Sequence, residues 1–146
     1  MSMTNAAEAN LLNLLFVNID WANIGDAAGL QNSATAGSFY VSLHTADPGE
    51  AGTQSTSEVA YTSYARVAVA RSAGGWTLTA QTISNTALVQ FPTATGGTAT
   101  ATYFGIGTDL SGAGNLLMSG ALTSSLSISN GIQPQFAAGA LTVTVD

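Results

Sequence analysis

The chain has 146 residues, enough for one domain that buries roughly 70% of the surface exposed by its unfolded chain. Only 7% of its residues are charged, with two basic and eight acidic side chains and a net charge of −6, and it has no cysteine. Nucleic-acid binding depends on clusters of Lys and Arg, and disulfides and thiolate zinc sites depend on Cys. The composition therefore excludes nucleic-acid binding, disulfides and thiolate zinc sites.

The surface is expected to be rich in hydroxyl groups, because serine and threonine occupy 34 positions and glycine occupies 16. Long charged side chains lose much entropy when they are ordered, and most are depleted from interfaces. A surface with few of them is typical of a protein that assembles with partners. No apolar run approaches the roughly 20 residues that a membrane-spanning helix needs, so no membrane partner is expected.

The first element is a predicted helix over residues 5–19, with Asn5 as its cap and Glu8 placed as in a capping box. Apolar residues recur along it at helical spacing and continue just past its end. This stripe either packs on the domain's own sheet or forms an arm that docks on a neighbouring subunit. The residues of that interface hypothesis are Leu11, Leu12, Leu15, Phe16, Ile19 and Trp21.

From residue 38 onward the apolar period changes from 3.6 to 2, which predicts strands. The expected strands are residues 39–44, 64–71, 76–80, 87–91, 98–106, 116–119, 122–128 and 141–145, with 64–71 and 76–80 joined as a hairpin across the turn at 72–75. The last of them either joins the chain's own sheet or pairs with another chain.

Short strands separated by turn residues, with no helices between them, predict a mainly β fold: an antiparallel β-sandwich or jelly-roll-like domain with one N-terminal helix. The expected division is an N-terminal helical segment at residues 1–22 and a β-sandwich domain at residues 38–146.

The sequence indicates no catalytic residue, so we expect no enzyme. His44 is the one histidine, and we expect it to be a solvent-facing or hydrogen-bonded residue at a strand end. Asp47, Glu50 and Glu58 share one loop region, but their spacing matches no dedicated calcium loop, so no metal is predicted. The glycines at 105 and 107 lack the third glycine and the helix of a dinucleotide site, so no cofactor is predicted either.

The aromatic residues raise the question of carbohydrate binding. Trp76 shares a strand face with Leu78, so we expect it to be buried. Tyr61 and Tyr64 belong to the loop from Glu50 to Tyr64, and as an exposed pair they form the alternative hypothesis of a glycan-binding site.

Four stretches of the chain resemble one known family. They are SFYVSLHTADPG at 38–49, YARVAVARSAGGWT at 64–77, FGIGTDLSGAGNLL at 104–117 and SGALTSSLSISNGIQPQFAAGALTVT at 119–144. They are similar to small structural proteins of tailed-phage virions, labelled tail-fibre-like in some genomes and capsid cement or decoration proteins in others. The resemblance covers nearly the whole chain, and it transfers a role rather than an active site.

The resemblance implies a β-sandwich that forms a homotrimer on the virion after assembly in the cytoplasm of the host bacterium. Its expected partners are copies of itself and the major capsid protein or other virion proteins. A projecting fibre usually carries a long repetitive shaft, and this chain has no internal repeat, which favours a capsid cement protein that bridges capsid subunits. The alternative is an adhesion module, associated with a tail or head fibre, that binds host glycan.

Overall fold

A computed structural model describes residues 2–145, which form two compact units. The helix-containing unit comprises the described residues up to 38, residues 70–89 and the described residues from 136 onward, and the four-stranded unit comprises residues 39–69 and 90–135. Each unit is therefore assembled from several segments. The predicted division into 1–22 and 38–146 follows the order of the chain instead, and it stays a prediction.

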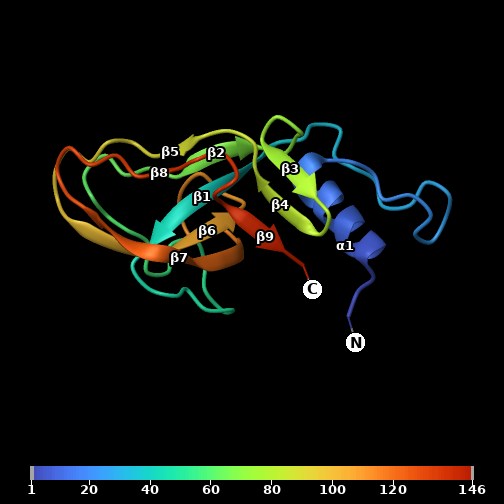
Figure 1. The fold of residues 1–146 in the computed structure, drawn as a ribbon, viewed down its shortest axis with the longest axis horizontal. Helices are drawn as coiled ribbons and strands as arrows, with labels where there is room; N and C mark the ends of the chain where they lie inside the picture. The colour runs from blue at the N-terminus through green and yellow to red at the C-terminus, as the bar shows by residue number, and fades with distance from the viewer. Residues whose placement is uncertain (1, 146) are drawn as a thin grey trace. The chain divides into compact units, whose positions relative to one another are not determined.

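The elements are shown in Figure 1. In chain order they are the α-helix α1 (Asn5–Leu12), the π-helical turn η1 (Asn13–Val17) and the strands β1 (Ser38–His44), β2 (Val67–Ala70), β3 (Trp76–Thr79), β4 (Thr82–Asn85), β5 (Val89–Gln90), β6 (Ala99–Gly107), β7 (Leu116–Ile128), β8 (Gln135–Phe136) and β9 (Thr142–Thr144). The sheets have the strand orders β2-β1-β6-β7, β3-β4-β9 and β5-β8.

Helix α1 begins after Thr4, whose hydroxyl accepts a hydrogen bond from the Ala7 N–H at 3.4 Å. The prediction that Asn5 caps the helix is wrong by one residue, because Asn5 is already helical. After Leu12 the helix widens into η1, which ends at Asn18 in a left-handed conformation with φ 59°. The expected helix over 5–19 is confirmed in place, two residues shorter at its C-terminal end.

The apolar side of this helix packs on β3 and β4 within the helix-containing unit. Leu12 and Phe16 are fully buried, and the Phe16 ring meets the Trp76 ring edge-on at 4.8 Å. Burying a side chain of this size contributes roughly 1.5–3 kcal/mol relative to leaving it exposed. The first of the two predictions for the apolar stripe, packing on the chain's own sheet, is confirmed for these two residues.

Arg71 holds the C-terminal end of η1. Its Nε–H donates to the Leu15 carbonyl at 2.5 Å, one Nη2 N–H donates to Leu14 O at 2.9 Å, and one Nη1 N–H donates to Ala36 O at 3.1 Å. Carbonyls at the end of a helix lack partners within the helix and carry partial negative charge. The Arg71 guanidinium donates hydrogen bonds to these carbonyls and offsets their partial negative charge. It also connects the end of η1 to the segment that contains Ala36.

The predicted hairpin between residues 64–71 and 76–80 is wrong. Residues 72–75 do turn, since the N–H groups of Gly75 and Trp76 both donate to Ser72 O at 2.9 Å, but β2 and β3 join different sheets. The hairpin is instead β3–β4, in which Thr79 lies opposite Thr82. Its turn places Ala80 at φ 54°, a conformation usually taken by Gly or Asn, so the sequence carries no signal for it.

In the four-stranded unit β1 lies between β2 and β6, and both faces of its second half are buried. Val41 and Leu43 occupy one face, and Ser42 and His44 occupy the other. Gly105 lies opposite Ser42, where a Cβ atom would come within 2.6 Å of His44 Nε2 and Ser42 Oγ. Only glycine leaves room for this pair of polar side chains.

Strand β7 is one continuous element, whereas the sequence predicted two strands at 116–119 and 122–128. It pairs antiparallel with β6, and the pairing is interrupted twice. Near its start, Ile106 lies opposite Met118 and Gly107 lies opposite Leu116, so Leu117 is an extra residue and is 45% exposed. Such bulges redirect side chains and are common at sheet edges, and β7 is an edge strand.

The mainly β class with antiparallel sheets and one N-terminal α-helix is confirmed, and it is consistent with a β-sandwich. The terminal strand β9 pairs with β4 of its own chain, which confirms the first of its two predicted roles. Strands β4 and β8 were not predicted. Within residues 2–145 the structure contains no helix that is long and apolar enough to cross a membrane.

Candidate functional site

His44 lies at the centre of a buried polar cluster in the four-stranded unit. Its Nδ1 is 2.8 Å from Thr56 O, and its Nε2 is 2.8 Å from Ser42 Oγ. A carbonyl can only accept, so Nδ1 carries the proton and Nε2 accepts from the Ser42 hydroxyl. Burial lowers the pKa of His44, which keeps the ring neutral. Of the two predictions for this residue, the hydrogen-bonded histidine is confirmed and the solvent-facing one is wrong.

A serine hydroxyl bonded to an oriented imidazole is also the arrangement that activates a nucleophile. Here Ser42 and His44 are both 0% exposed. A substrate could not reach the hydroxyl in this conformation. The pair instead joins strand β1 to the loop that carries Thr56.

Glu58 and Arg66 form an ion pair beside this cluster. Arg66 Nε and Nη2 donate to the two carboxylate oxygens of Glu58 at 2.8 and 2.7 Å. Arg66 also donates to Asp109 O at 2.9 Å and to Gly112 O at 2.7 Å. Donating a hydrogen bond to the Glu58 carboxylate raises the pKa of Arg66. This one side chain therefore ties together the loop after β1 and the loop before β7.

Tyr64 extends the same network. Its hydroxyl donates to Glu58 Oε1 at 2.8 Å and accepts from the Leu43 N–H at 3.1 Å, and burial raises its pKa far above the usual value. The Tyr64 ring stacks on Phe91 at 6.2 Å and meets Tyr61 edge-on at 5.3 Å. The phenol is thus a protonated structural donor.

The two tyrosines predicted as a glycan-binding pair do come together, but they are not equally accessible. Tyr61 is 3% exposed, and its hydroxyl donates to Pro92 O at 2.8 Å. Its ring cannot stack on a sugar in this conformation. Tyr64 is half-buried and lines an open hollow, so it alone of the pair could contact a ligand.

That hollow, called the Arg66 hollow below, has a volume of about 370 Å³. It is lined by an aromatic ring, an ion pair and a small-residue loop: Glu58, Tyr64, Ala65, Arg66, Leu110, Ser111 and Gly112. The Arg66 side chain is 3% exposed, and four of its five N–H groups have the acceptors named above. The hollow therefore offers an aromatic surface, a carboxylate and a hydroxyl to a polar ligand.

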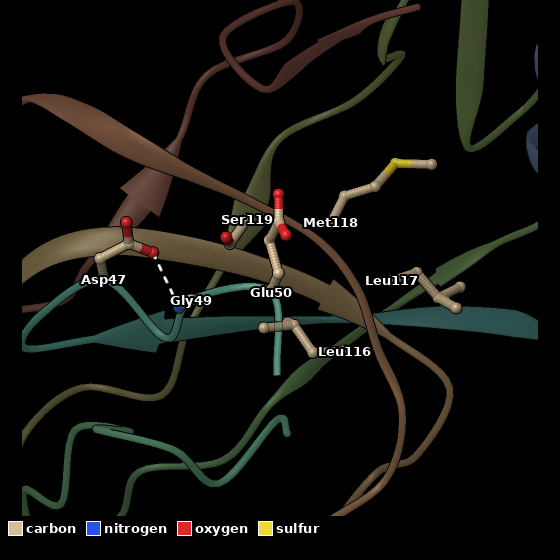
Figure 2. A pocket seen from close by; sticks show the side chains of 7 residues that line it. All are labelled: Asp47, Gly49, Glu50, Leu116, Leu117, Met118 and Ser119. Atoms are coloured by element: carbon tan, nitrogen blue, oxygen red, sulfur yellow. Dashed lines mark hydrogen bonds between the residues drawn. The ribbon is translucent and has the colours of Figure 1, made fainter. Parts of the chain in front are cut away.

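A second hollow, of about 300 Å³, lies between the loop after β1 and the start of β7 (Figure 2). Its lining residues are Asp47, Gly49, Glu50, Leu116, Leu117, Met118 and Ser119. Asp47 Oδ1 accepts the Gly49 N–H at 2.9 Å, which shapes the turn, while Glu50 is exposed to solvent. This site is open and acidic, with apolar side chains on its β7 side.

The acidic residues considered for calcium do not gather. Glu58 is bonded to Arg66, whereas Asp47 and Glu50 line the second hollow. Among residues 2–145 no three His, Asp or Glu side chains lie where they could share a metal ion.

The predicted interface residues of the N-terminal segment differ in exposure. Leu12 and Phe16 are fully buried, Leu11, Leu15 and Trp21 are half-buried, and Ile19 is 49% exposed. Backbone hydrogen bonds of 2.9 Å in both directions between Trp21 and Leu30 close the loop that follows. Ile24 and Leu30 on this loop are 41% and 44% exposed. The surface that a partner could reach is thus this loop rather than the helix stripe, and the interface itself stays a prediction.

Sequence reasoning missed the polar clusters of the four-stranded unit. Ser42 and His44 are two residues apart on a strand and so share a face, which is a signal that could have been recognised. The Glu58–Arg66 pair had no such signal, because its partners are brought together by loops. Trp76 is buried as predicted, and its Nε1 is the one buried side-chain N or O atom within residues 2–145 that has no hydrogen-bond partner.

Comparison with known proteins identifies the class of protein. The family model described as podophage GP4 fiber I protein gp80 matches residues 2–144. The sequence matches no curated protein. Since the family model spans both compact units, the chain belongs to the podophage GP4 fiber I protein gp80 family and is a structural protein of a phage virion.

Proposed function

We propose that this protein is a non-enzymatic building block of a phage fibre, and that it works by packing against copies of itself and against neighbouring virion proteins. The observation that carries the proposal is the match of a fibre-protein family over residues 2–144. The short, non-repetitive sequence by itself favours a capsid cement role. The family match shifts the choice toward the fibre, in which a small protein can serve as one segment or as an adaptor.

The surface chemistry supports a role in assembly. The only two basic side chains of the sequence, Arg66 and Arg71, are both engaged within the chain. Many serine and threonine residues are exposed to solvent. Ile19, Ile24 and Leu30, in the loop after η1, are exposed apolar residues. Side chains that lose little entropy on ordering suit a permanent interface. We propose a homotrimer with no nucleic-acid and no membrane partner.

The placement is tested on intact virions. Immunogold labelling and peptide quantification by mass spectrometry should locate the protein at a fibre, with tens of copies or fewer per particle. Labelling over the whole head, with hundreds of copies, would establish the capsid cement role instead and overturn the fibre proposal. Native mass spectrometry of the purified chain should give a trimer mass.

A second candidate function, glycan binding, is favoured by the Arg66 hollow, since it presents the Tyr64 ring beside polar groups. The test is a glycan array probed with the purified protein and with Ala65→Trp, which fills the hollow from an exposed position and leaves the Glu58–Arg66 pair in place. Binding should be lost in Ala65→Trp and kept in Ala73→Trp, a control in the other unit. If the wild-type protein binds no glycan, this candidate fails.

A further inference from the structure

The two faces of the β3-β4-β9 sheet differ sharply in chemistry. Trp76, Ile83 and Asn85 on one face are at most 1% exposed. Every side chain on the opposite face carries a hydroxyl. In the pairing register these residues form two rows across the three strands, Thr77–Ser84–Thr142 and Thr79–Thr82–Thr144, and together they are called the hydroxyl face.

The hydroxyl face is accessible and partly ordered by its own hydrogen bonds. Thr77, Thr79, Thr142 and Thr144 are exposed. Thr82 Oγ1 and Thr144 Oγ1 are 2.9 Å apart, and Thr77 Oγ1 is 2.8 Å from Thr86 Oγ1. Within residues 2–145 the hydroxyls of Thr79, Ser84 and Thr142 make no hydrogen bond, so they can bond to an incoming surface.

The hydroxyl face carries no charged side chain, although the chain as a whole is acidic. Each chain carries a net charge of −6, so copies repel one another wherever acidic residues meet. The acids of the described residues all lie elsewhere: Glu8 in α1, Asp20 and Asp26 in the loop after η1, Asp47, Glu50 and Glu58 in the loop after β1, and Asp109 in the loop before β7. Asp146 lies outside the described residues. Like-charge repulsion is therefore absent among the six residues of the hydroxyl face.

We propose that the hydroxyl face is the centre of the contact between copies of this chain. A hydroxyl both donates and accepts a hydrogen bond, so the hydroxyl faces of the three copies of the proposed homotrimer can contact one another around its three-fold axis without any matching of charges. The threonine methyl groups add apolar area between the rows. This inference rests on the assembly role proposed above and names the surface that carries it.

A second copy fits the face better than the other occupants considered. A basic partner would find no carboxylate among the six side chains. A glycan would find no aromatic ring, and ligand sites are concave, whereas the polar face of a short sheet is open. A stable interface uses about 20–30 residues on each side, so these six residues form its centre and flanking segments complete it.

The test compares two double substitutions that change the net charge equally. Thr77→Lys with Thr142→Lys places positive charges on the hydroxyl face. Thr100→Lys with Ser127→Lys, the matched control, alters an exposed cross-strand pair of the four-stranded unit. Association is measured by sedimentation velocity and native mass spectrometry, with circular dichroism as the check on folding. The first variant should associate at least tenfold more weakly than wild type, and the control should match wild type.

A milder variant, Thr77→Ala with Thr142→Ala, removes both the hydroxyl and the methyl groups without adding charge, so it should still associate more weakly than wild type. The proposal is overturned if both face variants associate like wild type, if the control is the weaker of the two lysine variants, or if wild type is a monomer at millimolar concentration. A monomer that still labels a fibre on the virion would contradict this inference and leave the proposed function standing.

Discussion

Each of the two units contains one arginine, and the two guanidinium groups are neutralised in different ways. In the four-stranded unit Arg66 is 6% exposed and meets a carboxylate, Glu58, as well as two backbone carbonyls. In the helix-containing unit Arg71 is half-buried and meets the carbonyls at the end of η1. The more buried guanidinium has a full counter-charge, and the less buried one is matched by the partial charges of a helix end. Removing a partner should therefore harm the two units unequally.

The largest effect is expected from Glu58→Gln. This substitution leaves the Arg66 guanidinium buried without its carboxylate, which costs about 3–5 kcal/mol when a buried pair is broken. The midpoint of urea unfolding, followed by fluorescence, should fall accordingly. Replacing both partners, in Glu58→Leu with Arg66→Met, should lower the free energy of unfolding by less than Glu58→Gln alone. If Glu58→Gln lowers it by less than about 1 kcal/mol, the ion pair is effectively solvated and the prediction is wrong.

A smaller effect is expected from Arg71→Met, which keeps an unbranched apolar stem and removes the hydrogen bonds to Leu14 O and Leu15 O. Hydrogen bonds to charged groups contribute about 1.5–3 kcal/mol, and no buried counter-charge is left behind. Amide hydrogen exchange should accelerate in residues 13–17 while residues 39–44 keep their protection. Equal acceleration in both segments would contradict a local role, and Arg71→Lys should restore part of the protection.

The smallest effect is expected from mild acid. Burial lowers the pKa of His44 in the folded state, so below about pH 6.5 the unfolded chain binds a proton that the folded chain does not. Stability is therefore full above that pH and declines as the pH falls, by at most about 1.4 kcal/mol per pH unit for one group. The difference in unfolding free energy between pH 7.5 and pH 6.0 should shrink in His44→Gln. An unchanged difference would assign the acid sensitivity to other groups.

The sequence predicted the elements whose signal is local. The alternation of Phe39, Val41 and Leu43 is confirmed as strand β1, and the helical spacing of Leu12 and Phe16 is confirmed as a buried stripe. Trp76 is in the core, as its strand neighbour Leu78 indicated. In each case the periodicity of a few neighbouring residues already specifies which side of the element faces the core.

Errors arose where the chain changes sheets. The turn at Ser72 looks like a hairpin turn, yet the strand before it, β2, and the strand after it, β3, belong to different sheets. The true hairpin turns at Ala80, whose positive φ is not a preference of alanine and is imposed by the pairing of Thr79 with Thr82. A local propensity of about 1–2 kcal/mol is overridden when strand pairing and burial favour the other conformation.

The sequence by itself determined that this protein is mainly β with one N-terminal helix, that it has few charges, and that it resembles phage virion proteins. Only the tertiary structure decided what its few charged residues and its buried polar groups do. The loop after β1 brings Glu58 to Arg66 and Thr56 to His44, and the β3–β4 hairpin pairs with the distant strand β9 to form the hydroxyl face. Periodicity in the sequence indicates which way a side chain points. These contacts depend instead on which strands pair and on the path of the loops, and both are set by the fold as a whole.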